Sequence, residues 1–272
     1  MTVGKLSTVL IGLLLFGLTA SAEPKLSNEQ IYALFSRANQ AFRQANSATA
    51  GSEEGKVLYE KSILSYEKII NDGQIKNAGL YYNLANAYFL KEDIGRAILN
   101  YRRAEKLDKT DTNVQKNLAF ARSRRIDKVK LKTEKRVLQT LFFWHYDFSI
   151  KTKFIVACIC FAIVCISLTI MVWWGRNAPG TVTAAVTCIL TTCFFVSVIV
   201  ELNNQTNQTC GVITDVEVVA RQGDGQNYSP SFKEPLHGGT EFDLIERRPG
   251  WFHIRLFDDS EGWIPETSAD LI

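Results

Sequence analysis

The sequence predicts a multidomain protein that combines a helical-repeat domain, a two-helix transmembrane hairpin and a small β-barrel. Three observations lead to this fold class. Aromatic and alanine positions recur in a 34-residue unit over 78–111, two uncharged apolar runs flank a short turn, and residues 212–272 alternate apolar and polar side chains between glycine-rich turns. A chain of 272 residues is long enough to hold several such modules.

Residues 1–22 have the composition of a secretory signal peptide. Lys5 precedes an apolar stretch from Val9 to Leu18, and Ala20-Ser21-Ala22 follows as a cleavage site. The apolar stretch is shorter than the roughly 20 residues that a spanning helix needs. We therefore expect the mature chain to begin at Glu23, with an uncleaved anchor as the alternative.

Residues 23–125 are predicted to form the helical-repeat domain. The clearest unit places an aromatic residue, Leu, a small residue and Tyr on one helix, then Ala, an aromatic residue and Ala on the next: Tyr81, Leu84, Ala85, Tyr88, Ala97, Tyr101 and Ala104. These positions resemble the tetratricopeptide (TPR) pattern, in which small residues let two antiparallel helices approach closely. A degenerate unit precedes it, with Phe35, Ala38, Asn39 and Phe42 at the first-helix positions and a long polar link from Asn46 to Gly55. A closing helix, capped by an Asp or Thr, is expected from Val114 to Arg124.

A stack of such repeats has a concave groove that commonly holds a peptide of a partner protein. Asn83, Asn86 and Arg102 lie on or near the helix faces that line it, and we take them as peptide-binding candidates. A solvated helix face is the alternative interpretation of each of these residues.

Two uncharged runs, Phe154–Trp174 and Thr181–Val200, are predicted to be transmembrane helices. At about 1.5 Å per residue, the first run spans roughly 30 Å of hydrocarbon. The segment between them, Gly175–Gly180, has the composition of a tight turn, and Leu202–Cys210 is expected to be a polar linker.

A basic and aromatic connector, residues 126–153, precedes the first apolar run. Ten basic and three acidic side chains fall between residues 122 and 153, together with the rings Phe142, Phe143, Trp144, Tyr146 and Phe148. Nucleic-acid binding uses the same ingredients, but a position directly before a transmembrane helix favours contact with lipid headgroups. We therefore expect a lipid-facing connector and no nucleic-acid partner.

Residues 212–272 are predicted to form the β-barrel, with strands at Val216–Ala220, Glu241–Ile245, Trp251–Leu256 and Gly262–Ile264. Gly250-Trp251-Phe252 and Gly262-Trp263-Ile264-Pro265 resemble the bacterial SH3 (SH3b) family, whose members often bind cell-wall peptides or protein segments. Trp251 and Trp263 are therefore ligand-groove candidates, with a core role as the equal alternative.

Topology follows from the signal peptide and the two spans. Export of Glu23 onward places residues 23–153 and 212–272 on the same, extracytoplasmic side of a bacterial inner membrane. The basic residues before Phe154 point to the opposite orientation, because positive charge favours the cytoplasmic side. We favour the signal peptide, since long translocated domains escape this charge bias.

The order of signal peptide, TPR repeats, two membrane helices and SH3b domain resembles the BatE group of the Bat (aerotolerance) family, as do Tyr81–Tyr88 and Gly262–Pro265. The resemblance covers essentially the whole mature chain. It implies a membrane complex with sister Bat proteins that carry von Willebrand A and TPR domains, associated with stress tolerance. On this basis the sequence predicts a membrane-anchored adaptor or scaffold. The alternative is a cell-envelope sensor that binds peptidoglycan peptides through the SH3b domain.

No enzyme is predicted. His145, His237 and His253 lie in different segments, and no hydrolase, zinc-protease or phosphate-loop motif occurs, so we expect no catalytic residues, cofactor or metal. Five of the six cysteines fall in the apolar runs, where they behave as small hydrophobic residues. The sixth, Cys210, is expected to be a free thiol, with an intermolecular disulfide as the alternative.

Overall fold

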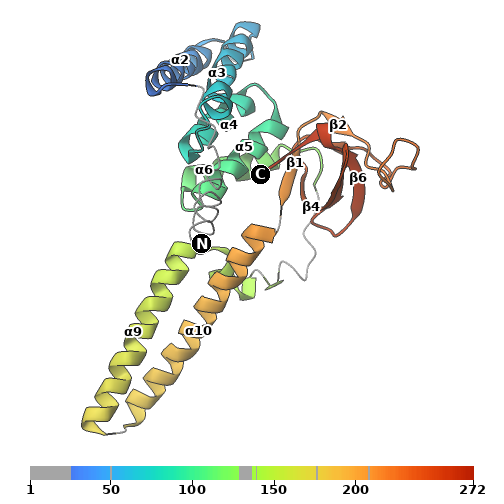
Figure 1. Ribbon diagram of the computed structural model, residues 1–272. Helices are drawn as coiled ribbons and strands as arrows, with labels where there is room; N and C mark the ends of the chain where they lie inside the picture. The colour runs from blue at the N-terminus through green and yellow to red at the C-terminus, as the bar shows by residue number, and fades with distance from the viewer. Residues whose placement is uncertain (1–25, 50, 129–136, 139, 176, 208) are drawn as a thin grey trace, which may run out of the picture. The chain divides into compact units, whose positions relative to one another are not determined.

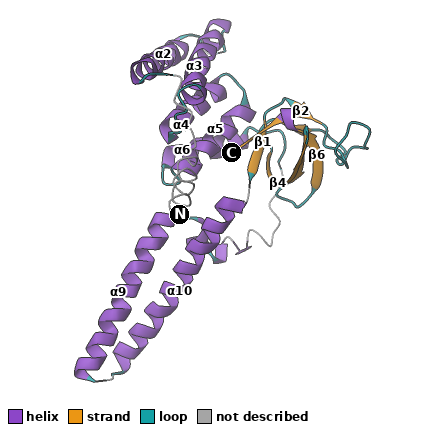
Figure 2. Ribbon diagram, viewed as in Figure 1, coloured by secondary structure: helices purple, strands orange, loops and turns teal. Residues whose placement is uncertain are grey.

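The computed structural model describes residues 26–49, 51–128, 137–138, 140–175, 177–207 and 209–272 (Figure 1). The predicted signal peptide lies outside the described residues. The described α-helices end at Asn207 and all strands follow. Figure 2 shows the helices in purple and the strands in orange. The chain divides between Lys76 and Asn77 into two compact units, which are described separately.

The first unit is a pair of helices, α2 (Asn28–Ser47) and α3 (Glu53–Asn71). Ser27 begins α2 with a reciprocal cap, since its hydroxyl accepts from the Gln30 amide and the Gln30 side chain accepts from the Ser27 amide. Ser52 caps α3 by accepting from the Gly55 amide at 3.1 Å. This cap shortens the link between the helices to residues 48–52, where the sequence suggested a longer one.

The second unit begins with three helices, α4 (Ala78–Leu90), α5 (Ile94–Leu107) and α6 (Thr112–Ser123). Their first turns are capped by Asn77, Asp93 and Asp111. The predicted repeat unit over 78–111 therefore coincides with α4 and α5, and the capped closing helix is confirmed. The three small residues expected at close helix crossings, Ala85, Ala97 and Ala104, are all completely buried.

One set of side-chain contacts occurs in both helix pairs. In the first pair, the Tyr66 hydroxyl donates to Asn39 Oδ1 at 2.6 Å, and the ring of Phe35 lies 6.1 Å from that of Tyr66. In the second pair, the Tyr101 hydroxyl donates to Asn86 Oδ1 at 2.6 Å, and the ring of Tyr82 lies 6.1 Å from that of Tyr101. Asn39 and Phe35 thus correspond to Asn86 and Tyr82. For the first helix of each pair, this register is one residue later than the spacing pattern implied, because the repeated hydrogen bond, and not the aromatic spacing, fixes it. For the second helices, Tyr66 corresponds to Tyr101, as the 35-residue spacing predicted.

Two long apolar helices follow, α9 (Ile150–Trp174) and α10 (Ala178–Asn207), after the short helix α8 (Phe143–Tyr146). Both are long and apolar enough to cross a membrane, and they pack together along the chain's hairpin (Figure 1). Gly175, at a φ of +81°, ends α9. The expected polar linker after residue 201 is instead helical as far as Asn207, since extending a formed helix adds one hydrogen bond per residue.

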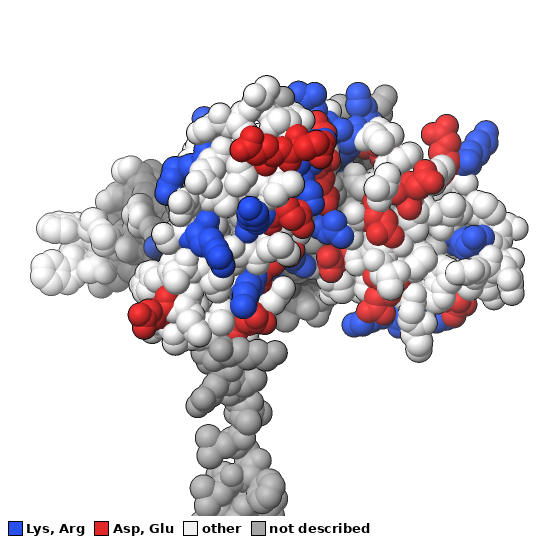
Figure 3. Space-filling view, turned by 90° about the horizontal axis from the view of Figure 1, so that it is seen from above, with Lys and Arg blue, Asp and Glu red and all other residues white. Residues whose placement is uncertain are grey.

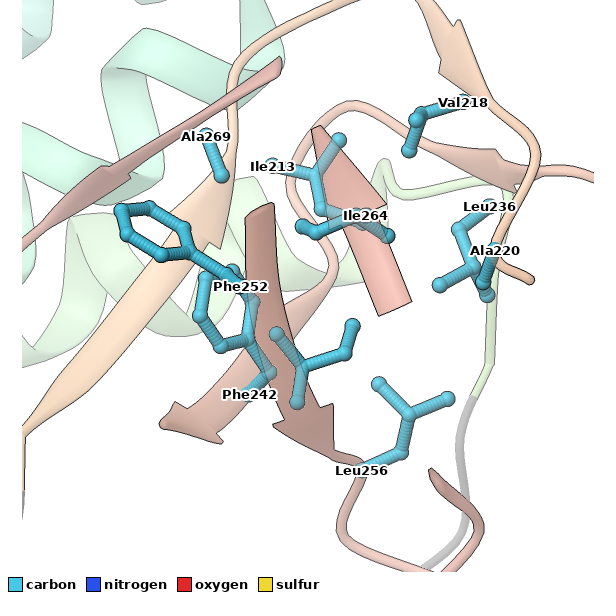
Figure 4. Close-up of a cluster of buried hydrophobic side chains, with 10 residues drawn as sticks. Ile213, Val218, Ala220, Leu236, Phe242, Phe252, Leu256, Ile264 and Ala269 are labelled. Carbon is cyan, nitrogen blue, oxygen red and sulfur yellow. The ribbon is translucent and has the colours of Figure 1, made fainter. Parts of the chain in front are cut away.

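The β domain contains a five-stranded antiparallel sheet in the order β6-β5-β4-β1-β7. Its strands are β1 (Cys210–Ile213), β4 (Glu241–Arg248), β5 (Trp251–Arg255), β6 (Glu261–Pro265) and β7 (Ala269–Leu271). The strands β2 (Glu217–Val218) and β3 (Leu236–His237) form a separate pair, and a single 3₁₀ turn, Glu266–Ser268, precedes β7. Apolar side chains from both groups of strands form one buried core, among them Ile213 and Phe242 of the sheet and Val218 and Leu236 of the separate pair (Figure 4).

Three of the four predicted strands are confirmed, and the fourth, Val216–Ala220, is reduced to the two residues of β2. The sequence interpretation missed β1, β3 and β7. The residue Cys210, expected at the end of a linker, begins β1, which lies between β4 and β7.

Candidate functional site

The helices of the second unit meet the β domain at a close backbone contact. Gly95 lies in the first turn of α5, and a Cβ atom added there would come within 2.8 Å of the Ile213 carbonyl oxygen in β1. Gly239, with a φ of +94°, precedes β4, and a Cβ atom there would come within 3.0 Å of Ile98 Cδ1. Glycine at position 95 therefore lets the backbone of α5 touch that of β1, and glycine at position 239 leaves room for the side chains of Ile98 and Arg125.

A buried glutamate, Glu241, forms the centre of this contact. Its side chain is 3% exposed and accepts two hydrogen bonds from Arg122, from Nε at 2.8 Å and from Nη2 at 2.6 Å. Arg125 Nη1 and Arg102 Nε each lie 3.2 Å from a carboxylate oxygen of Glu241. We call these four residues the Glu241 cluster. Burial alone would raise the pKa of Glu241, but the hydrogen bonds and charges of the arginines hold this pKa below its usual value.

A second carboxylate, Asp127, fixes the other side of the same contact. It follows α6 and accepts from the His237 amide at 2.6 Å, from His237 Nδ1 at 2.9 Å and from the Thr240 hydroxyl at 2.6 Å. Its partial burial raises its pKa, but the hydrogen bonds from Thr240 and His237 outweigh burial and leave the pKa lowered. At the far end of the sheet, Arg103 donates to the Leu271 carbonyl oxygen at 2.9 Å. Helices α5 and α6 and the β domain are thus joined by a continuous set of polar contacts.

The peptide-binding candidates of the helical region lie in different settings. Arg102 pairs with Glu241 and, at 2.5 Å, with Glu105. Asn86 accepts from the Tyr101 hydroxyl and, at 3.1 Å, from Asn117. Asn83 is half-buried on α4. The structure therefore gives Arg102 and Asn86 partners within the chain, and it does not bring the three residues into one site.

The two tryptophan candidates of the β domain also differ. Trp263 is 7% exposed, and its ring stacks on that of His253 with centroids 4.6 Å apart. The guanidinium of Arg248 lies 4.7 Å from the centroid of the same ring. Trp251 is half-buried at the start of β5 and pairs with Pro265 in β6. Of the two side chains, Trp251 is the more accessible to a ligand.

An ion cluster joins the base of the apolar hairpin to the helical region. Lys153, at the start of α9, is completely buried and pairs with Glu201 near the end of α10. Glu201 also pairs with Lys109 from the loop between α5 and α6. Because Lys153 also donates to the His145 carbonyl oxygen, this cluster ties the connector to both long helices.

Sequence reasoning missed the roles of Glu241, Asp127, Lys153 and Glu201. A signal was present for Lys153 and Glu201, because the first precedes one apolar run and the second ends the other, and a hairpin brings such positions together. For Glu241 and Asp127 the sequence holds no local signal, since their partners lie more than a hundred residues away.

The aromatic connector lies against α10. The rings of Phe148 and Phe194 stack with centroids 6.5 Å apart, and Phe142 and Tyr146 are about half exposed. A mainly apolar pocket of about 410 Å³ lies between the connector and α10, lined by residues that include Trp144 and Val196. The predicted basic character of this stretch is partly neutralised, since Arg122, Arg125 and Lys153 are ion-paired within the fold.

Charge elsewhere on the molecule is mixed. On the face seen in Figure 3, Lys and Arg are interspersed with Asp and Glu, and no large patch of one sign covers the residues in view. In the part of the chain that the structure describes, no three His, Cys, Asp or Glu side chains are placed to hold a metal ion. Cys210 has a free thiol that contacts Asp243, and burial raises its pKa to about 11, which keeps the thiol protonated at neutral pH.

Comparison with known proteins adds no family assignment: the chain matches no protein-family model and no curated protein sequence.

Proposed function

We propose that the protein is a membrane-anchored adaptor of a Bat-type membrane complex. In this proposal, the helical region is a TPR array that binds a segment of a partner protein. The β domain is an SH3b-type barrel that binds a second protein or a cell-wall ligand. The hairpin of α9 and α10 spans the bacterial inner membrane and holds both regions on its extracytoplasmic side. The proposal assigns no catalytic step and no cofactor to the chain.

The Glu241 cluster is the observation that carries this proposal. An adaptor must hold its binding surfaces at fixed positions, and a buried carboxylate bound by three arginines joins α5 and α6 to the β domain. The ion pairs of Glu201 extend the same connection to the hairpin. These ion pairs join the helices, the β domain and the hairpin of the second unit to one another. Such a connected arrangement is better suited to a scaffold than domains held together only by flexible linkers would be.

The test is chemical cross-linking in native membranes, followed by purification of the tagged full chain and mass spectrometry. We expect cross-linked membrane proteins with von Willebrand A or TPR domains. As a matched control, a tagged chain that joins residues 1–22 to residues 126–207 retains the signal peptide and the hairpin but lacks both soluble regions. It should recover none of these proteins. Equal recovery with this control would contradict the adaptor proposal.

A cell-envelope sensor is the second candidate, and Trp251, which is only half-buried, favours it. Its test is co-sedimentation of the full chain with purified peptidoglycan, comparing Trp251→Ala with the wild type. Binding that depends on Trp251, together with an absence of cross-linked proteins, would put the sensor ahead of the adaptor.

A further inference from the structure

The most open feature of the first unit is a groove between α2 and α3. Two adjoining hollows, of about 340 and 460 Å³, lie along the two helices and share Arg37 as a lining residue. Gln30 and Gln44 mark its ends on α2, and a helix advances about 20 Å between positions that far apart. The groove is therefore long enough for a segment of about two to four helical turns of a partner.

The groove has a single sign of charge. Arg37, Lys61 and Lys68 line it, and none of its lining residues is acidic. Residues 26–76 contain six acidic and six basic side chains, so this stretch is neutral as a whole, and none of its acids lines the groove. Within the described residues, the three cations have no ion-pair partner. We call Arg37, Lys61, Lys68 and the side chains between them the basic groove.

Apolar side chains lie beside these cations. Leu34 and Leu58 line the groove half-buried, and Leu64 lines it with 56% of its surface exposed. Leaving this leucine exposed to water is unfavourable, because burial of apolar surface stabilises a protein or a complex. A ligand that covers Leu64 and pairs with the cations would bury this apolar surface and would also supply the cations with counter-charges.

The residues at the equivalent positions of the second helix pair differ in type and in exposure. The contacts shared by the two pairs align Arg37 with Leu84 and Leu64 with Leu99. Leu84 and Leu99 are each 2% exposed, whereas Arg37 is exposed and Leu64 more than half exposed. A terminal repeat needs a polar outer face for solubility. Solubility alone does not explain a face whose charged lining is entirely positive in a neutral unit.

We propose that the basic groove binds an acidic, partly apolar segment of a partner protein. Carboxylates of that segment pair with Arg37, Lys61 and Lys68, and its apolar side chains cover Leu64. Gln44 supplies a side-chain amide for hydrogen bonds to the bound segment. The inference deepens the adaptor proposal and rests on it, by naming the surface and the chemistry of the partner. A nucleic acid fits less well, because no aromatic ring lines the groove for base stacking.

The test places a photoreactive benzoylphenylalanine at Gln40 in the tagged full chain and irradiates intact cells. Mass spectrometry then identifies the cross-linked segment. We expect an acidic segment of another membrane-complex protein, and a drop of about tenfold in adduct yield when Arg37→Glu and Lys61→Glu are combined. The matched control is Arg43→Glu, an exposed arginine of α2 outside the groove, which should leave the yield unchanged. Circular dichroism of the purified variants verifies that each one folds.

Every other result overturns the inference. These results are no adduct above the non-irradiated background, a neutral or basic segment, a lipid adduct, a site within the same chain or in a second copy of it, and equal yields in the charge-reversed and control variants.

The failure of the adaptor proposal can be distinguished from the failure of the basic groove. If the charge-reversed chain still recovers its partners in the native-membrane cross-linking experiment, only the basic groove is wrong, whereas no partner for the wild type removes the adaptor itself.

Discussion

At the scale of single residues, Glu241 has the largest structural role and the weakest sequence signal. It follows a glycine-rich turn, and its arginine partners lie far back in the chain, Arg102 on α5, Arg122 on α6 and Arg125 just after α6. A carboxylate this deeply buried is tolerated only when it is paired and hydrogen-bonded. The sequence interpretation put Arg102 in a peptide groove because helical periodicity identifies the face of a helix and not what covers that face.

Glu241→Gln should destabilise the protein markedly. The change removes the counter-charge of Arg122 and Arg125 and leaves Arg102 paired only with Glu105. We expect this to cost about 2 to 4 kcal/mol, below the full value for a buried pair because the arginines retain some contact with water. Thermal unfolding of the detergent-solubilised chain measures the effect. The control Glu246→Gln removes an exposed pair with Arg248 and should cost less than about 1 kcal/mol. Equal melting temperatures for the two variants would contradict the assigned role of Glu241.

Acid should loosen the contact between the helices and the β domain. The pKa values of Glu241 and Asp127 are lowered in the fold, so their contribution to stability is complete above the unfolded value of about 4 and is lost as the pH falls through the lower folded values. The backbone amide of His237 donates a hydrogen bond to Asp127. Its hydrogen exchange, corrected for the intrinsic rate at each pH, should stay slow from pH 7 to pH 5. It should accelerate below pH 4. Asp127→Asn should weaken protection at all pH values, and a protection factor in the wild type that is constant down to pH 3 would count against this assignment.

At the scale of elements, the helices were predictable and the sheet only in part. The helices could be predicted because closely packed helices need small residues at regular spacing, and Ala85, Ala97 and Ala104 occupy such buried positions. The strands β1 and β7 have only four and three residues, and their pairing depends on partners elsewhere in the sheet. Such short strands have no period of their own that could distinguish them from a linker.

Ala97→Leu should disrupt the helical region. Ala97 is completely buried in α5, and overpacking such a position typically costs about 1 to 3 kcal/mol. Ala119→Leu makes the same substitution on the exposed face of α6 and should change stability by less than about 0.5 kcal/mol. Thermal melts followed by circular dichroism compare the two variants. A similar loss for both would show that the alanine register is not a packing constraint.

At the scale of the whole molecule, the Lys153–Glu201 pair bears on topology. It joins the start of α9 to the end of α10, so the segments before and after the hairpin leave it at the same end. With both helices in a membrane, those segments must share one side. Charge distribution and the signal peptide then disagree only on which side that is.

Protease added to intact spheroplasts should therefore digest both soluble regions. We expect epitope tags at Glu29 and after Ile272 to disappear together, because the signal peptide exports both regions. The control is a cytoplasmic protein that stays intact until the cells are lysed. Protection of both tags would favour the orientation indicated by the basic connector, and protection of only one would contradict the hairpin.

The place of β1 in the sheet also orders the biogenesis of the chain. Only residues 208 and 209 separate α10 from β1, so this strand is the first part of the β domain to follow the hairpin during synthesis. Its two partner strands, β4 on one edge and β7 on the other, are synthesised later. Until residues 269–271 are in place, a nascent chain presents an unpaired strand edge beside the last helix of the hairpin. Loss of β7 would for this reason appear first as degradation by quality-control proteases, before any change in partner binding was measurable.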